Sequence, residues 1–369
     1  MANKTARLGD LATYINGYAF KPADWGDTGL PIIRIQDLTG NSYQLNRYDG
    51  EYPERIEVND GDVLISWSAS LGVYVWQRGK ALLNQHIFKV VFDKLPVNKE
   101  YFVFAVEHKL AEMESKTHGA TMKHIVKKDF DGTTIPYPPI EKQAEIADHL
   151  RRITSLIDRQ TEQLLLLDQL VKSRFIELFG DPVSNSMGLP TEPMTTICAI
   201  IDGDRGKNYP KQDEFSDTGY CLFLNAKNVT ATGFSFENRM FITKEKDDAL
   251  HNGKLERGDV VLTTRGTLGN LAFYDDSVPF ENVRINSGMV ILRMKKSVMT
   301  EVFFMEQFKL QLHSIKGKIA SGSAQPQLPI STMNKIRILL APMALQEQFA
   351  AFVEQTDKSK LCGTMEVAA

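Results

Sequence analysis

The sequence GDVLISWSASLG at residues 61–72 returns as GDVVLTTRGTLG at residues 258–269, about 200 residues later. Both copies begin with Gly-Asp, continue through a β-branched run and end in Leu-Gly, in the same order and at the same spacing. Alternating apolar positions on the two sides of a glycine-containing turn indicate a β-hairpin in each copy. The chain is therefore predicted to contain one structural unit written twice.

The repeat extends beyond the hairpin into two helical segments. An apolar stripe typical of one buried helix face occurs in both copies. Its members are Phe102, Val106, Leu110 and Met113 in the first copy, and Phe304, Phe308, Leu312 and Ile315 in the second. A Pro-x3-Gln pattern follows at residues 139–143 and again at residues 342–346. Matches in the same order across strand, helix and helix start argue against coincidence and predict two mixed α and β units.

The segment between the units has a different pattern. Residues 143–179 lack glycine and proline and place apolar side chains at heptad spacing, which is typical of a coiled coil about 55 Å long. An amphipathic helix lying on one domain is the alternative, but such helices usually carry a wider apolar stripe. These apolar side chains form the predicted seam, the surface that contacts another helix or a protein subunit. Its members are Ile146, Leu150, Ile153, Ile157, Leu164, Leu167, Val171 and Leu178.

Length and composition limit the class of protein. A chain of 369 residues with 43% hydrophobic and 24% charged residues fits two globular domains. Its net charge of −3 excludes a uniformly basic nucleic-acid coat but leaves room for local basic faces. Three cysteines without metal-type spacing indicate a reducing compartment. Because no signal peptide or membrane-spanning segment is found, we expect a cytoplasmic protein with no membrane role.

Basic stretches without acidic residues lie at matching places in the two copies. Residues 115–128 and 307–346 contain no Asp or Glu. Each holds a small polar loop, THGATMKH at 117–124 and ASGSAQPQ at 320–327, whose backbone could approach phosphates and whose side chains could read base edges. Lysines that merely solvate a helix end are the alternative, but repetition favours binding. With the hairpin loops, the predicted DNA-binding residues are Ser66, Lys116, Lys123, His124, Arg265, Lys318, Gln325 and Gln327.

Catalytic signatures are missing from the sequence. It contains no phosphate-binding loop, nucleophile elbow or HExxH motif. Asp202, Asp204 and Lys207 superficially resemble a nuclease set, but they occupy a glycine-rich turn that has no counterpart in the first copy. His118 and His124 have no acidic or cysteine partner nearby. We therefore predict no catalytic residue, no metal site and no cofactor.

Taken in order, the paired GDV strands, basic loops and Pro-x3-Gln helix starts resemble the specificity subunit of a type I restriction-modification enzyme. The segment SRFIELFGDP at residues 173–182 belongs to the same resemblance. The resemblance implies a non-catalytic subunit with two target-recognition domains, each reading half of a bipartite site in double-stranded DNA. It also implies helices that dock methyltransferase subunits and, through them, restriction subunits.

The predicted fold is α+β and pseudo-two-fold symmetric, with two duplicated mixed α/β target-recognition domains joined by long coiled-coil helices. The expected domains are 1–138 and 181–341, with a central spacer helix at 139–180 and a second at 342–369. The heptad pattern of the second helix fails after Val353, so this helix is expected to be truncated. The open seam would then bind a methyltransferase subunit or a second copy of the chain. An interaction scaffold with two degenerate domains and little DNA affinity is the alternative function.

Overall fold

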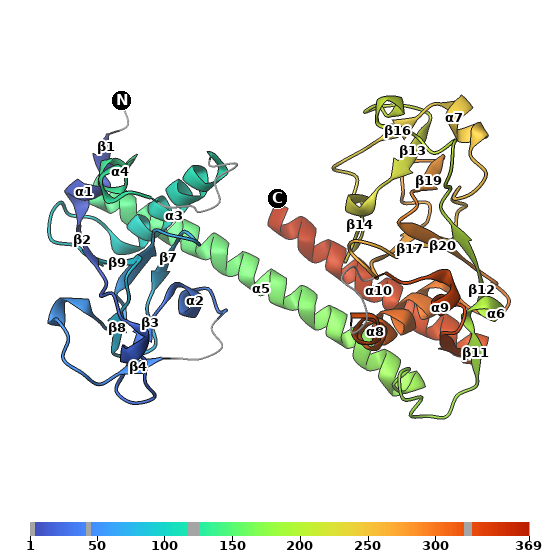
Figure 1. The fold of residues 1–369 in the computed structure, drawn as a ribbon, viewed down its shortest axis with the longest axis horizontal. Coiled ribbons are helices and arrows are strands. Elements are labelled where there is room, and N and C mark those ends of the chain that lie inside the picture. The colour runs from blue at the N-terminus through green and yellow to red at the C-terminus, as the bar shows by residue number, and fades with distance from the viewer. Residues whose placement is uncertain (1–3, 42–45, 117–124, 321–326, 369) are drawn as a thin grey trace. The chain divides into compact units, whose positions relative to one another are not determined.

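The computed structural model describes residues 4–41, 46–116, 125–320 and 327–368, without the side chains of 114–116, 313, 318–320 and 361–368. The chain divides into two compact units, Met1–Asp158 and Arg159–Ala369. The long helix α5 (Ile140–Phe179) crosses this division, so each unit contains one part of it (Figure 1). Domain limits at residues 138, 180 and 341 remain a prediction.

The first unit is built around two four-stranded sheets. One sheet is antiparallel with strand order β2-β9-β6-β7, and the helix α3 packs its apolar stripe against this sheet. The other sheet has strand order β4-β3-β8-β5, with β3 parallel to β8. The elements are β1 (Thr5–Arg7), α1 (Leu8–Leu11), β2 (Thr13–Asn16), η1 (Pro22–Asp24), β3 (Leu30–Ile33), α2 (Ile35–Leu38), β4 (Arg47–Tyr48), η2 (Glu54–Ile56), β5 (Glu57–Val58), β6 (Val63–Ser66), β7 (Gly72–Val75), β8 (Ala81–Leu83), β9 (Ile87–Val91), α3 (Lys99–Lys116), α4 (Lys127–Gly132) and β10 (Thr134–Pro136).

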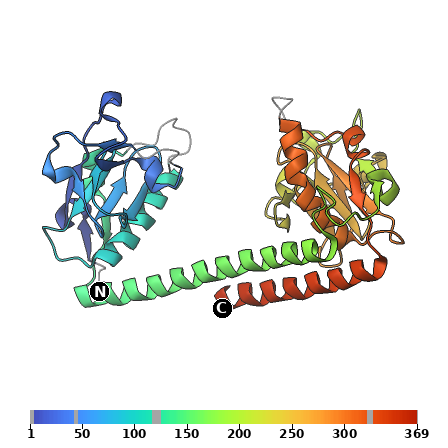
Figure 2. The ribbon, with the colours of Figure 1, turned by 90° about the horizontal axis from the view of Figure 1, so that it is seen from below.

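The second unit repeats this plan. Its antiparallel sheet has order β12-β20-β17-β18, its second sheet pairs β13 in parallel with β19, and α8 covers the first sheet (Figure 2). The predicted duplication and mixed fold are confirmed. The elements are β11 (Thr191–Pro193), α6 (Met194–Ile197), β12 (Cys198–Asp202), η3 (Gln212–Glu214), β13 (Cys221–Leu224), η4 (Ala226–Asn228), β14 (Val229–Thr230), β15 (Gly233–Phe234), β16 (Phe241–Ile242), α7 (Lys244–Ala249), β17 (Asp259–Thr263), β18 (Leu271–Tyr274), β19 (Val283–Ile285), β20 (Met289–Met294), α8 (Glu301–Ala320), α9 (Ile330–Met333), β21 (Arg337–Leu339) and α10 (Met343–Ala368).

The repeated Gly-Asp dipeptide is a turn that starts the central strand of each unit. Gly61 and Gly258 have φ values of +88° and +98°, which glycine adopts at little steric cost. The carboxylate that follows accepts a backbone N–H from three residues earlier, Asn59 to Asp62 at 2.9 Å and Glu256 to Asp259 at 2.7 Å. The motif is therefore local turn chemistry, which explains why the same two residues appear in both copies.

The repeated Pro-x3-Gln pattern fastens each spacer helix to its unit. Gln346 is fully buried, and its Oε1 accepts the backbone N–H of Thr300 at 2.9 Å. Its Nε2 donates to the carbonyl oxygens of Ala341 at 2.9 Å and Val298 at 3.1 Å. Gln143 repeats this arrangement, accepting from Asn98 N and donating to Pro138 O. A buried glutamine thus satisfies backbone groups around the N-terminus of each helix.

The second spacer helix continues past the point at which its heptad pattern fails. α10 runs antiparallel to the C-terminal part of α5 (Figures 1 and 2), and Phe349 contacts both Phe175 and Phe179. At the following polar seam positions, the buried Thr356 donates its hydroxyl to the Phe352 carbonyl. The prediction that the seam ends near Val353 is wrong, because polar side chains there find partners within the helix pair.

Lys360 extends the same seam by pairing with Asp168 of α5 at 2.7 Å. Of the predicted interface residues, Val171 is buried and Leu178 packs on the core of the second unit. Both side chains are therefore covered within the second unit, which contradicts the expectation that they lack a partner. Leu164 and Leu167 are half-buried, as is Ile146 in the first unit. Among the predicted residues of the first unit, Leu150, Ile153 and Ile157 are exposed.

Candidate nucleic-acid interface

The loop end of the central hairpin is the same in both units. Ser66, at the end of β6, donates its hydroxyl to the Ser70 carbonyl, and Thr263, at the end of β17, donates to the Thr267 carbonyl. Both side chains are fully buried. The prediction that Ser66 contacts DNA is therefore corrected, because its only hydroxyl proton is used to close the turn.

The residues that follow the predicted reading loops are bound to this hairpin end. Just after residues 117–124, the Ile125 N–H donates to the carbonyl of Trp67 at 3.0 Å. Just after residues 320–327, the Leu328 N–H donates to the carbonyl of Thr264 at 3.1 Å. The two bonds occupy equivalent positions of the repeat. Each unit therefore brings a hairpin loop and the end of a basic segment together, although they are far apart in sequence.

Several predicted contacts lie outside the described residues, namely Lys123, His124 and Gln325. Lys116 and Lys318 belong to α3 and α8, but their side chains are likewise not described. Among the predicted residues that are described, Arg265 and Gln327 are exposed. Their role in DNA binding remains a prediction.

Two cations share the hairpin end of the second unit. Arg265 lies in the hairpin loop, where its backbone N–H contacts the Gly288 carbonyl at 3.3 Å. Lys316 reaches over Gly269 from α8, since a Cβ added to that glycine would lie 2.8 Å from the Lys316 Cε. Both cations are exposed. This end of the unit can present positive charge to an anionic ligand.

Some other cations of the predicted basic stretches, the acid-free residues 115–128 and 307–346, are paired within the fold. Arg337 donates to the Thr191 hydroxyl at 2.8 Å, which joins β21 to β11. Lys309 pairs with Glu306, a residue just outside the acid-free stretch, at 2.5 Å. In the first unit Lys127 pairs with Asp131 at 2.7 Å. Counting charges along the sequence thus overstates the free positive charge, because helix neighbours three or four residues away neutralise it.

The equivalent end of the first unit carries rings instead of a guanidinium. Trp67 stacks on Phe88, with ring centroids 5.5 Å apart and an interplanar angle of 22°. It meets His86 edge to face at 5.1 Å. Thr264 and Gly288 occupy the matching places in the second unit. The Trp67 N–H donates to the His86 carbonyl, and the Thr264 N–H donates to the Gly288 carbonyl in the same way. The two units therefore offer different chemistry on the same framework.

The acidic residues of the Asp202–Lys207 turn are used for structure. Asp204 is buried, and its carboxylate accepts backbone N–H groups from His251 at 2.5 Å and Arg205 at 2.7 Å. Burial acts to raise the pKa of this carboxyl, but the N–H donors outweigh it, so the pKa lies below its ordinary value.

Among described residues there is no group of three or more His, Cys, Asp or Glu that could hold a metal. No described helix is long and apolar enough to span a membrane.

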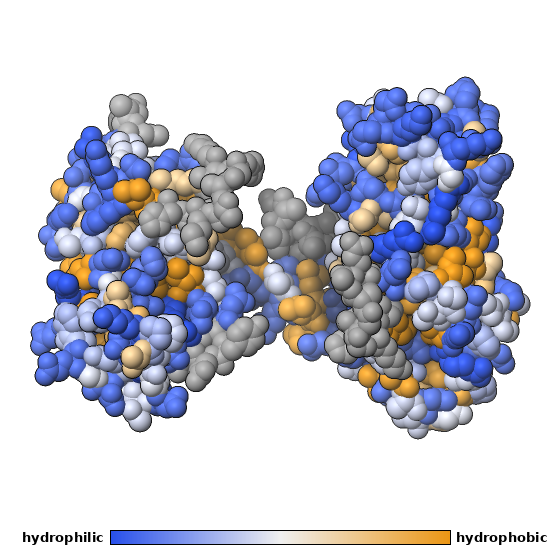
Figure 3. Space-filling model, in the orientation of Figure 1, coloured by the Kyte–Doolittle hydropathy of each residue, from blue (hydrophilic) through white to orange (hydrophobic). Residues whose placement is uncertain are grey.

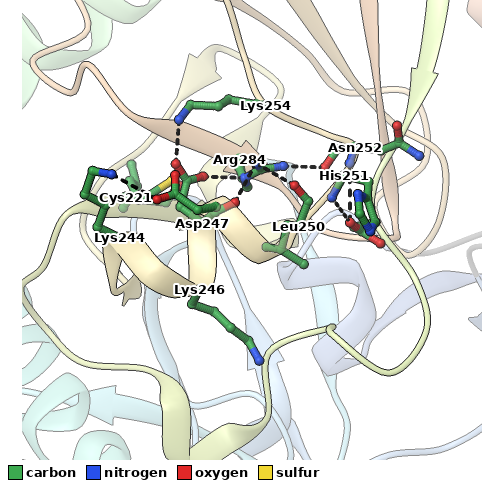
Figure 4. A network of polar contacts seen from close by, with 12 residues as sticks. Cys221, Lys244, Lys246, Asp247, Leu250, His251, Asn252, Lys254 and Arg284 are labelled. Atoms are coloured by element: carbon green, nitrogen blue, oxygen red, sulfur yellow. Dashed lines mark hydrogen bonds and ion pairs between the residues drawn. The ribbon is translucent and has the colours of Figure 1, made fainter.

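Sequence reasoning missed a buried polar cluster of the second unit. Asp247 and Arg284 form a buried ion pair, and Arg284 also donates to the carbonyls of Asn252 and Leu250 at 2.7 and 3.1 Å (Figure 4). Lys254 makes a second ion pair with Asp247. Burial acts to raise the pKa of the Asp247 carboxyl, yet these two cations hold it below its usual value. No periodic signal connects residues so far apart in sequence.

Comparison with known proteins bears on both units. A family described as type I restriction modification DNA specificity domain matches residues 2–167 and 195–362. The chain is 29% identical over 314 residues to the type I restriction enzyme EcoBI specificity subunit of Escherichia coli, covering 78% of the chain and 64% of that protein. It is 24% identical over 379 residues to the MjaVIII specificity subunit of Methanocaldococcus jannaschii, covering 96% and 86%.

Solved structures agree on the fold. The S subunit of a type I restriction-modification system from M. genitalium superposes with a TM-score of 0.58 at 15% identity, covering 99% of the chain and 92% of that structure. A chain from a structure of the type I R-M system gives a TM-score of 0.52 at 17% identity, covering 99% and 93%. The resemblance drawn from the sequence motifs is confirmed.

Proposed function

Because the chain belongs to the family of type I restriction-modification DNA specificity domains, we propose that it is the DNA sequence-recognition subunit of such an enzyme. Each compact unit reads one half of a bipartite site in double-stranded DNA, and the chain performs no catalysis of its own. It acts in the cytoplasm. The chain spans 64% of the length of its E. coli relative.

The observation that carries this proposal is the repeated hairpin end. In both units a backbone bond pins the segment after the predicted reading loop to the residue after the central strand, at 3.0 Å in one and 3.1 Å in the other. A framework that repeats while the residues at matching places differ, with the half-buried Trp67 and His86 in the first unit against the buried Thr264 and the half-buried Gly288 in the second, suits two half-sites of different sequence. Exposed cations such as Arg265 and Lys316 supply phosphate contacts.

The proposed protein partners dock on α5. Its C-terminal part exposes Leu165 at 58%, Leu166 at 55% and Leu170 at 49%, on the sides that α10 leaves uncovered. Orange side chains interrupt the hydrophilic surface along this helix (Figure 3). Exposed apolar groups in a row usually mark an interaction surface. Methyltransferase subunits bind there, and restriction subunits join through them; self-association of the chain is the competing outcome.

The test is selection of duplexes from a random-sequence library by the chain together with its methyltransferase subunits. We expect a bipartite motif. Lys123→Ala and Lys318→Ala should each weaken binding to all duplexes and lower the slope of log affinity against log salt by about 1. Lys296→Ala is the control, because this exposed lysine follows the far end of β20. Recovery of no motif, with a chain that folds and binds methyltransferase, would refute DNA recognition and leave a scaffold.

A further inference from the structure

The second unit contains an insertion next to its hairpin end. Gly17 and Gly203 are equivalent, because each packs closely against the carbonyl oxygen of an asparagine. A Cβ on Gly17 would lie 2.0 Å from the Asn84 oxygen, and a Cβ on Gly203 would lie 2.2 Å from the Asn286 oxygen. Lys21 and Lys211 are equivalent too, each donating its backbone N–H to an acid three residues later at 2.7 Å. Residues 18–20 join these landmarks in the first unit, whereas residues 204–210 join them in the second.

Buried polar groups bind the inserted turn to the second unit. The Asp204 carboxylate accepts the N–H groups of Arg205, His251 and Asn252, at 2.7, 2.5 and 3.3 Å. The His251–Asn252 segment is itself fixed from below, because Arg284 donates to the Asn252 carbonyl and is paired with Asp247 (Figure 4). The insertion is therefore anchored through Asp204 to a buried ion pair.

The anchored turn places Arg205 beside the hairpin end and carries a second exposed cation, Lys207, two residues further along the chain. Arg205 and Lys207 are exposed, while Asp204 is buried beneath them. The Arg205 guanidinium contacts the Ser287 carbonyl at 3.4 Å and pairs with Asp202 at 3.0 Å. Ser287 immediately precedes Gly288, whose carbonyl accepts from Thr264 at 2.8 Å in the hairpin. The turn thus borders the surface that carries Arg265.

We propose that the Asp202–Lys207 turn is a phosphate-contacting element that only the second unit possesses, with Asp204 as its positioning residue. Arg205 and Lys207 bind backbone phosphates beside the half-site that the second unit reads. Asp204 does not touch DNA; it keeps the two cations in register with the hairpin loop. This inference rests on the proposed function and adds an asymmetry to it, because the first unit has the same framework without the turn.

The experiment uses the full chain with its methyltransferase subunits on a duplex carrying the selected motif, and maps phosphate contacts by ethylation interference. The double variant Arg205→Ala/Lys207→Ala should lose interference beside one half-site only and lower the salt slope by about 1–2, because Arg205 is already paired with Asp202. Asp204→Ala should lose the same interference although every cation remains, and Asp204→Asn should recover part of it. Lys296→Ala should leave the pattern intact.

Outcomes separate the two claims. If the wild-type complex selects a motif but the double variant keeps the wild-type interference and salt slope, the turn does not contact DNA and this inference is overturned. Because both substituted side chains are exposed, unfolding is not expected to mask that result, and a circular dichroism melt verifies it. If the wild-type complex selects no motif at all, the proposed function fails first and takes the inference with it.

Discussion

Replacement of Gln346 by alanine tests whether the repeated glutamine fastens the second spacer helix to its unit. The change removes three hydrogen bonds at a fully buried position and leaves the Thr300 N–H and the carbonyls of Ala341 and Val298 without this partner. An unsatisfied buried group costs about 1–3 kcal/mol. Because Val298 is only half-buried, its carbonyl can recruit water, so we expect a loss of about 3 kcal/mol in total.

Differential scanning calorimetry measures this loss. For a unit of this size, about 3 kcal/mol corresponds to a fall in Tm of about 6–12 °C in the transition of the second unit. Gln355→Ala makes the same chemical change at an exposed site of the same helix and should move Tm by less than about 2 °C. Gln143→Ala should destabilise the first unit through its bonds to Asn98 and Pro138. Equal Tm values for Gln346→Ala and Gln355→Ala would refute the argument.

Three further predictions concern pH, thiols and the hairpin turn. The pKa of Asp247 is lowered in the folded chain, so its stabilising effect is present above about pH 4 and is lost as the pH falls below that value; Asp247→Asn should flatten this acid limb in urea titrations, and an unchanged limb would contradict the assignment. Burial raises the pKa of the Cys198 and Cys221 thiols to about 12, so an alkylating reagent at pH 8 should modify them only after denaturation, as peptide mass spectrometry can verify. Ala69 has φ +60° where its counterpart Gly266 has +70°, so Ala69→Gly should stabilise the first unit by up to about 1 kcal/mol, and a lower Tm would show that the turn is not strained.

The sequence alone predicted the features that depend on residues close together along the chain. The Gly-Asp dipeptide, the apolar stripe of α3 and α8 and the heptads of α5 are each set by spacings of a few residues, so their repetition could be recognised without a structure. The family resemblance followed from the order of these same local features. Even so, counting charges within residues 307–346 left out Glu306, the acid three residues before Lys309, with which this lysine pairs.

Tertiary structure decided which polar side chains are bonded within the protein and which can still bind a ligand. Ser66 closes its own hairpin, Asp204 binds backbone N–H groups from residues 251 and 252, and Arg284 reaches Asp247 on another element. The bonds of Asp204 and Arg284 have no period, because the chain can bring two distant segments together once a core has formed. Lys360 likewise looks like a failure of the heptad but pairs with Asp168 on α5, whereas Thr356 is satisfied within its own helix by the Phe352 carbonyl. Local spacing fixes which elements form, whereas burial and long-range pairing fix what each polar side chain can still bind.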